Sequence, residues 1–297
     1  MDVSVIIVNY NTLELTKNTI NSVIEKTEDI NYEIILVDNA STDGSIEYFE
    51  EKYNDKIIFL KNEENLGFGR ANNKGIEIAK GKYVFLLNSD TLLINNAIKI
   101  LFEYMEKNIN VGVCGGNLYD IELNPVHSFK KELITLINEF DFFKNKIARI
   151  FLKKRLDFNY KNTPLEVGYI TGADMFIRKK ILEQSENFDD DFFMYFEETE
   201  LTYRIKKLGY KVMSVPEAKI IHLEGKSSVF KEKKIRIFLE SKYKYFYKTQ
   251  KEKEIKWSYI ISQIKYLSIP TKVNIKKFQI NKEEYRKFQK WRNEEKL

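Results

Sequence analysis

The stretch Val3–Asn11 reads VSVIIVNYN and gives the first indication of the fold. Its first part, Val3–Val8, is almost entirely apolar and β-branched, as in a strand that is buried on both faces. Three polar residues, Asn9, Tyr10 and Asn11, follow directly. Strands buried on both faces belong to sheets that helices cover on both sides, so this stretch predicts an α/β protein.

The next hundred residues repeat this pattern. Further buried strands are predicted at Glu33–Val37, Ile57–Leu60 and Tyr83–Leu87. Apolar residues at helical spacing predict helices at Thr12–Lys26, Gly67–Lys80 and Ala97–Lys107. This alternation predicts a mostly parallel, Rossmann-like sheet with helices on both faces. The later elements expected are a strand within Gly168–Lys180, a helix within Phe188–Gly209, and short strands at Lys211–Val215 and Lys219–His222.

Polar clusters follow three of the predicted strands, at Asn9–Asn11, Asp38–Asn39 and Asn88–Asp90. Parallel α/β sheets bind their ligands at the carboxyl ends of the strands. Asp and Asn also end strands and cap helices for purely structural reasons. Three such clusters at one edge of a sheet favour a binding site.

Two carboxylates of this edge suit particular ligands. Asp90 suits Mg²⁺ or Mn²⁺, because such ions accept one or two carboxylates together with substrate phosphates. Asp38 can accept a hydrogen bond from a uracil or thymine ring, or cap the following helix. The loop from Gly67 lacks the spacing of a dinucleotide fingerprint. It supplies Arg70, which could contact a diphosphate or form an ion pair with an acidic residue at the surface. The candidate nucleotide-binding residues are Asn9, Tyr10, Asn11, Asp38, Asn39, Arg70, Asn88 and Ser89.

An acidic cluster follows the aromatic run Phe192–Phe196. Burial beside that run and like-charge crowding would raise a carboxyl pKa at Glu197 or Glu198 toward that of a general base. Glutamates are also favoured at a helix N-terminus, but the aromatic neighbours favour a catalytic role. His222 ends a predicted strand and precedes Gly225, a setting that suits contact with a metal or a phosphate.

Composition excludes several classes of protein. The 297 residues contain one cysteine, Cys114, and two histidines, which excludes a disulfide scaffold, a thiolate zinc cluster and a His-rich metal site. Cys114 and His127 are expected to be structural. The sequence contains no run of about 18 apolar residues, the length that a membrane-spanning helix requires. The N-terminus lacks the features of a signal peptide. We therefore expect a cytoplasmic protein.

The net charge of +5 is unevenly distributed. Residues 231–297 carry a net charge of +12, whereas residues 1–230 carry −7. This contrast predicts a catalytic domain at 1–230 and a basic helical extension at 231–297. An apolar stripe of the extension could bind an anionic membrane, pack on the catalytic body or pack on a second subunit, and its periodicity does not distinguish them. The stripe consists of Trp257, Ile260, Ile261, Ile264 and Leu267.

Five motifs occur in order: VSVIIVNYN, VDNASTDGS, NLGFGRANN, LLNSDT and FDDDFFMYFEETELTYRIKKLGY. They resemble those of bacterial family-2 inverting glycosyltransferases, most closely the rhamnosyltransferase-like branch, over roughly residues 3–250. The resemblance implies a GT-A fold with a nucleotide-sugar half at 1–115 and an acceptor half at 116–230. It also implies transfer from dTDP-rhamnose or a UDP-sugar to a glycan or lipid-linked acceptor in surface polysaccharide synthesis. Such acceptors imply a peripheral position at the inner face of the cell membrane.

Carried over by position, the resemblance implies that Asp38 holds a pyrimidine base. Asp90 matches the last position of an Asp-X-Asp element and would bind Mg²⁺ or Mn²⁺, with His222 as a second ligand. Glu198 would be the catalytic base beside Glu197. The implied donor and acceptor pocket includes Gly172, Ala173, Asp174, Tyr195 and Phe196. The chain departs from the family pattern at Asn88, which replaces the first Asp of the element, and in its acidic motif, where Glu replaces Asp.

Two other functions stay open at this point. A nucleic-acid-binding protein would explain the pI of about 8.8 and the Lys-rich tail, but not the acidic cluster. A nucleotidyltransferase would use the same phosphate-binding edge with a sugar phosphate and a nucleoside triphosphate. The strand-end carboxylates and the acidic cluster together favour glycosyl transfer.

Overall fold

Strand β1 (Val3–Asn9) has parallel neighbours on both sides. It pairs with β2 (Tyr32–Asp38) and β4 (Tyr83–Leu87), and β3 (Ile58–Lys61) pairs with β2. All four strands are parallel, as predicted, because the segments between them return along the outside of the sheet. Asn9 stands opposite Asp38 in the register, so the first two polar clusters meet at one edge.

The computed structural model describes residues 1–53, 57–136, 155–223, 231–250, 252–268 and 271–295. Its main sheet has nine strands, with the order β3-β2-β1-β4-β10-β6-β11-β5 and β8 paired with β11. The chain also forms a two-stranded sheet from β7 (Phe129–Lys130) and β9 (Tyr169–Ile170). The bounds of the remaining strands are β5 (Thr91–Leu93), β6 (Val111–Tyr119), β8 (Leu165–Glu166), β10 (Asp174–Arg178) and β11 (Lys211–His222).

The second half of the sheet departs from the expected pattern. Strand β10 is antiparallel to both of its neighbours, β4 and β6. The two short strands expected at Lys211–Val215 and Lys219–His222 form one strand, β11, with a register shift between Ser214 and Lys219. Strand β6 crosses the expected division at residues 115 and 116, so both halves of the catalytic region share one sheet.

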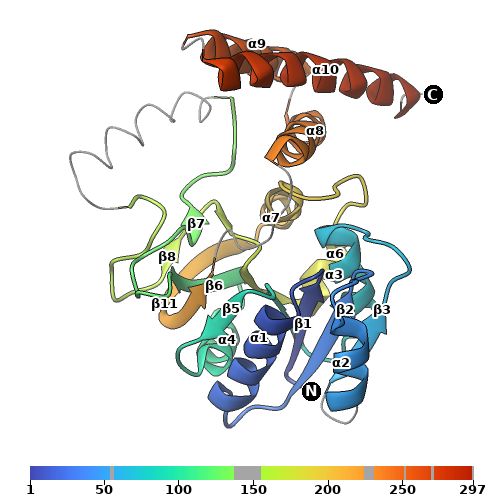
Figure 1. Ribbon diagram of the computed structural model, residues 1–297. Helices are drawn as coiled ribbons and strands as arrows, with labels where there is room; N and C mark the ends of the chain where they lie inside the picture. Colours follow the sequence, from blue (N-terminus) through green and yellow to red (C-terminus); the bar gives the residue numbers. More distant parts are fainter. Residues whose placement is uncertain (54–56, 137–154, 224–230, 251, 269–270, 296–297) are drawn as a thin grey trace.

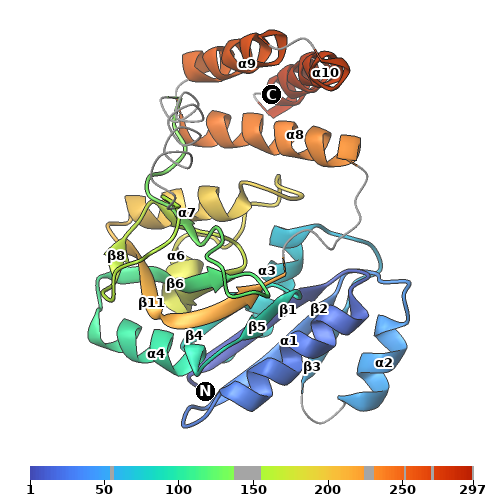
Figure 2. The same ribbon diagram turned by 60° about the vertical axis from the view of Figure 1, so that its left-hand side comes forward.

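Helices cover both faces of this sheet (Figures 1 and 2). One apolar core joins the sheet to α1 (Leu13–Lys26), α2 (Ser45–Lys52) and α4 (Ala97–Lys107). A second core, on the other face, joins it to α3 (Phe68–Ile78), α6 (Lys179–Gln184) and α7 (Glu197–Lys207). Alternate side chains of β1 enter the two cores, which explains why that strand is apolar almost throughout.

The basic extension forms a separate helical layer above α7 (Figure 1). It consists of α8 (Lys231–Thr249), α9 (Glu252–Leu267) and α10 (Lys272–Glu295). A third core, rich in aromatic rings, joins these helices to Phe192 and Phe196. Within the described ranges no helix combines the length and the hydropathy that a membrane span requires.

Candidate active site

A hydrogen-bond network holds the ends of β1 and β2 together. Asp38 is fully buried, and its carboxylate accepts from Nδ2 of Asn9 at 2.6 Å and from the backbone N–H of Ser41 at 2.8 Å. Oδ1 of Asn9 accepts in turn from Thr12 and Thr16 at 2.8 and 2.7 Å. Asp38 therefore organises this edge from behind its surface, and its direct contact with a base stays a prediction.

Two other members of the edge differ in exposure. Asn39 is buried, and its Nδ2 donates to the carbonyl oxygen of Gly67 at 3.0 Å, so it joins β2 to the glycine loop. Tyr10 keeps 44% of its surface exposed. Asn11 is also exposed, has a positive φ of 53°, and accepts the backbone N–H of Thr42 at 2.7 Å. Tyr10 and Asn11 are thus the residues of the first cluster that a nucleoside could contact directly.

Hydrogen bonds on both sides hold the end of β4 in place. The backbone N–H of Asn88 donates to the carbonyl oxygen of Ala173 at 3.0 Å, which joins β4 to the stretch before β10. The carbonyl oxygen of Ser89 accepts from Thr19 of α1 at 2.9 Å, and its hydroxyl lies 3.1 Å from that of Thr12. These contacts fix the position of the residue that follows, Asp90.

Asp90 and His222 form a pair. Nε2 of His222 lies 3.3 Å from Oδ1 of Asp90, and both side chains are partly buried. Strands β5 and β11 bring them together, with Thr91 opposite His222. Among the described residues no group of three or more His, Cys, Asp and Glu side chains gathers at one point. A carboxylate and an imidazole fit a divalent cation that takes its remaining ligands from a diphosphate.

Residues 224–230 lie outside the described residues, so the rest of the HLEGKSS stretch is not placed. Gly225, which comes after the strand predicted to end at His222, lies in this range and is not placed either.

The loop before α7 has an unusual backbone. Tyr195 and Phe196 both have left-handed φ angles, of 71° and 68°, which non-glycine residues adopt at a cost. The loop lies against the glycine stretch, because Phe68 donates its backbone N–H to the carbonyl oxygen of Phe193 at 2.9 Å. A β-carbon at Gly67 would lie 2.1 Å from that oxygen, so only glycine permits this approach.

Three glutamates in the first turn of α7 have different surroundings. Glu200 is neutralised by Arg204, whose Nη2 lies 2.6 Å from its carboxylate. Burial, and then the charge of Glu198, raises the pKa of Glu197 well above its ordinary value. Burial also raises the pKa of Glu198, which keeps some exposed surface. Glu198 is therefore the carboxylate of this turn that can meet a substrate and take its proton.

Polar residues at the strand ends, a carboxylate–histidine pair and a carboxyl group with a raised pKa thus occur in one α/β chain. Residues 4–185 match the model of the family described as "Glycosyl transferase family 2". The chain belongs to this family.

Curated relatives of this chain align over part of their length. A glycosyltransferase of Methanocaldococcus jannaschii is 34% identical over 135 residues, 44% of this chain and 47% of its own. The abequosyltransferase of Salmonella typhimurium is 28% identical over 52% of this chain and 48% of its own. A putative teichuronic acid biosynthesis glycosyltransferase of Bacillus subtilis is 32% identical over 43% and 51%. The chain spans about half the length of these relatives.

Two solved structures share the fold of this chain. TarS 1–349 of S. aureus, in complex with UDP, has a TM-score of 0.53 at 18% identity and covers 90% of this chain and 71% of its own. GalNAc-T7 with UDP, GalNAc and Mn²⁺ has a TM-score of 0.62 at 18% identity and covers 96% and 54%. The mixed sheet with a helical C-terminal region is therefore a GT-A-like fold, as the sequence predicted.

Several residues that were expected in the donor and acceptor pocket are buried in the structure. Phe196 is 7% exposed, and its ring lies 5.2 Å from Phe238 and 5.4 Å from Tyr245 of α8. Asp174 is fully buried and accepts the backbone N–H of Gly116 at 2.6 Å. Ala173, Asp174 and Phe196 are thus buried, and their contact with a donor or an acceptor stays a prediction. Gly172 and Tyr195 are partly exposed.

Helix α8 holds the loop before α7, which the sequence did not indicate. Ser241 donates to the carbonyl oxygen of Met194 at 2.7 Å, and Nζ of Lys244 donates to that of Asp191 at 2.9 Å. Nζ of Lys248 lies 2.6 Å from the carboxylate of Asp189 and also contacts that of Asp191. Arg70, expected at a diphosphate, is exposed and donates its Nε–H to the carbonyl oxygen of Asp190 at 3.0 Å. The predicted contact of Arg70 with a diphosphate stays a prediction.

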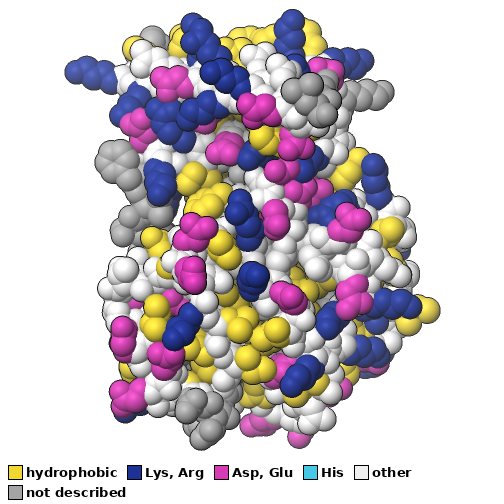
Figure 3. Space-filling model, turned by 90° about the vertical axis from the view of Figure 1, so that its right-hand side faces the viewer, with side chains coloured by type: hydrophobic (Ala, Val, Ile, Leu, Met, Phe, Trp, Pro, Cys, Tyr) yellow, Lys and Arg dark blue, Asp and Glu magenta, His cyan; other side chains and the backbone are white. Residues whose placement is uncertain are grey.

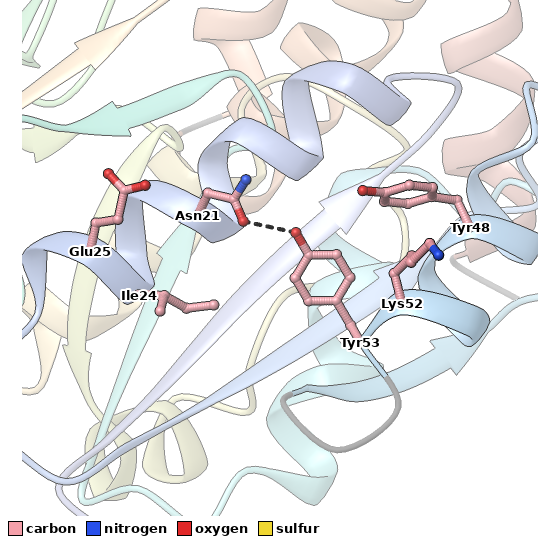
Figure 4. A pocket seen from close by; sticks show the side chains of 6 residues that line it. All are labelled: Asn21, Ile24, Glu25, Tyr48, Lys52 and Tyr53. Atoms are coloured by element: carbon pink, nitrogen blue, oxygen red, sulfur yellow. Dashed lines mark hydrogen bonds between the residues drawn. The ribbon is translucent and has the colours of Figure 1, made fainter.

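A hollow between α1 and α2, of about 280 Å³, lies apart from this site (Figure 4). Tyr53 donates its hydroxyl hydrogen to Asn21 at 2.8 Å across it. Its lining contains none of the candidate site residues and consists of Asn21, Ile24, Glu25, Tyr48, Lys52 and Tyr53.

Proposed function

We propose that this chain is a metal-dependent, inverting glycosyltransferase of the rhamnosyltransferase-like branch. It transfers a sugar from a UDP-sugar or dTDP-rhamnose to a hydroxyl of a glycan or lipid-linked acceptor, in the synthesis of a surface polysaccharide. The observation that carries the proposal is the 3.3 Å pair of Asp90 and His222 at the nucleotide edge of a family 2 chain. Neither residue alone would hold a metal, but the pair supplies two ligands to one point.

Asp90 and His222 would hold the divalent cation. When bound, the cation would offset the negative charge of the diphosphate beside residues 1–230, whose own net charge is −7. An imidazole ligand favours Mn²⁺ over Mg²⁺, because Mg²⁺ prefers oxygen ligands. The presence of Mn²⁺ in the GalNAc-T7 structure is consistent with this choice.

Glu198 acts as the general base. Its carboxylate takes the proton of the acceptor hydroxyl, and the hydroxyl oxygen attacks the anomeric carbon from the face opposite the diphosphate. The bond between that carbon and the diphosphate oxygen breaks, and its electron pair leaves with the diphosphate, so the configuration inverts. Glu200 is unsuited to the role because Arg204 neutralises it, and Glu197 because it is almost fully buried.

A uridine or thymidine diphosphate is the proposed carrier of the sugar. Both solved structures with the same fold contain UDP, which supports a pyrimidine nucleotide. Tyr10 and Asn11 are the exposed residues proposed to contact it, and Asp38 fixes the loop from behind.

A donor screen tests the proposal. The protein is incubated with UDP-glucose, UDP-galactose, UDP-N-acetylglucosamine, UDP-galactofuranose and dTDP-rhamnose, with Mn²⁺, Mg²⁺ or a chelator, and release of UDP or dTDP is measured. We expect UDP or dTDP to be released from one donor in the presence of Mn²⁺. Glu198→Gln should abolish this release. Turnover of a sugar phosphate with a nucleoside triphosphate, without release from any donor, would instead establish a nucleotidyltransferase.

A further inference from the structure

The apolar stripe of α9 faces away from the rest of the molecule. The helix packs on its neighbours through Ile255, Ser258, Ser262 and Gln263, all of which are buried. On the other side, Trp257, Ile264 and Leu267 are 54%, 62% and 54% exposed. The sequence left open whether this stripe packs inside the protein, and the structure places three of its residues at the surface.

The first turn of α10 carries two further exposed apolar side chains, which point to different faces of that helix. Val273 and Ile275 are 57% and 45% exposed, and a short connection joins α10 to the end of α9. Figure 3 shows hydrophobic side chains at this upper end of the molecule, between protruding Lys and Arg side chains. We call Trp257, Ile264 and Leu267, which share one face of α9, the apolar end surface.

The stretch of sequence that carries the apolar end surface is basic. Residues 255–282 contain six lysines and no Asp or Glu. Lys256, Lys265 and Lys272 are exposed beside the apolar residues. Lysine stems cover apolar area while their ammonium groups reach toward anions, so these residues add to the apolar surface and also charge its rim.

We propose that the apolar end surface docks on an anionic lipid bilayer. Trp257 and the aliphatic side chains enter the boundary between headgroups and acyl chains, and the surrounding lysines contact lipid phosphates. The inference does not depend on the proposed reaction, because docking and sugar transfer are measured separately.

Two other occupants fit this surface less well. A symmetric dimer places a patch against its own copy, so Lys256 and Lys272 of one subunit would approach the same lysines of the other. A nucleic acid would satisfy the lysines but leave Trp257, Ile264 and Leu267 in water. A bilayer covers the apolar residues and neutralises the lysines at once.

Vesicle flotation of the full chain tests the proposal. We expect flotation with vesicles that contain phosphatidylglycerol and much weaker flotation with pure phosphatidylcholine. The double variant Trp257→Ser with Ile264→Asn should lose at least about tenfold in vesicle affinity, because exposed apolar residues supply the insertion. The matched control is Ile109→Asn, since Ile109 is 80% exposed on the catalytic body and should not affect binding.

A charge comparison and a fluorescence measurement complete the test. Lys256→Glu with Lys272→Glu should weaken binding to anionic vesicles, whereas Lys107→Glu with Lys180→Glu, on the catalytic body, should not. In a Trp291→Phe background Trp257 is the remaining tryptophan, and its emission should shift to the blue when anionic vesicles are added. Absence of flotation, or equal loss in the paired variants, would overturn the proposal. A dimer that Trp257→Ser with Ile264→Asn dissociates, without vesicle binding, would assign the surface to a second copy.

Discussion

Nε2 of His222 lies 3.3 Å from Oδ1 of Asp90, although the two residues come from distant parts of the sequence. The antiparallel pairing of β5 with β11 produces this contact, since it sets Thr91 opposite His222. The backbone reinforces it, because Leu223 donates its N–H to the carbonyl oxygen of Asp90 at 2.9 Å. The pair is therefore held before any ligand arrives, which lowers the entropy cost of metal binding.

The first prediction concerns metal binding by this pair. Asp90→Asn and His222→Gln should each weaken Mn²⁺-dependent UDP binding by at least about tenfold, since loss of one ligand of a sparse set leaves the cation with mostly water. Isothermal titration of UDP with and without Mn²⁺ measures this effect without an activity assay. The control is His127→Gln, which changes the other histidine of the chain. Unchanged Mn²⁺ dependence in both site variants would rule out the metal role.

The second prediction concerns the base. Glu198→Gln should lower kcat by about 10²–10⁴-fold, the usual contribution of a general base, and leave UDP binding unchanged. Glu200→Gln is the comparison, because its carboxylate pairs with Arg204 and its loss should act on stability instead. Transfer by Glu198→Gln at the rate of the unaltered protein would refute the assignment.

A third prediction follows from the raised pKa of Glu198. A base must be ionised to act, so kcat should fall as pH decreases through a pKa that is higher than that of an ordinary glutamate. The pH profile of kcat measures this limb. A limb at the ordinary glutamate pKa would show that Glu198 is not the titrating base.

The fourth prediction concerns the contact between α8 and the loop. Lys248 lies against Asp189 and Asp191, so Lys248→Met leaves two carboxylates without their cation and releases the strained turn at Tyr195. We expect a higher KM for the acceptor and a lower kcat, with UDP affinity unchanged. Lys107→Met, on α4, is the matched control. A fall in thermal stability alone, with KM and kcat unchanged, would reduce Lys248 to a structural role.

The fifth prediction concerns Asp174, whose pKa burial raises well above its ordinary value. Because the folded state holds this proton and the unfolded state releases it near the ordinary pKa of about 3.9, stability should decrease as pH rises between the two values. Asp174→Asn keeps the shape and cannot titrate. The difference in Tm between the variant and the unaltered protein should therefore shift in favour of the variant as pH rises from about 5 to about 8. An equal difference at both pH values would contradict the shift.

The sequence alone determined the elements whose residues repeat a simple pattern. The four parallel strands and helices α1, α3 and α4 lie within a few residues of their predicted bounds, because their burial requires apolar residues at a regular spacing. The polar clusters at the strand ends were predicted for the same reason, since parallel strands end at one edge. Helix α8 begins at Lys231, and a domain boundary near residue 230 stays a prediction.

Only the tertiary structure decided which of the candidate residues are exposed and which are buried. Asp38 and Asp174 are fully buried, a property set by neighbours distant in sequence, and Phe196 packs against α8. The contact of Lys248 with Asp189 joins two segments that are distant in the sequence. The sequence pattern of neither segment predicts that the other packs against it. The same holds for the stripe of α9, because a helical period defines an apolar face but not what lies against it. Local pattern therefore specified the elements, and long-range packing specified their exposed faces and the roles of individual side chains.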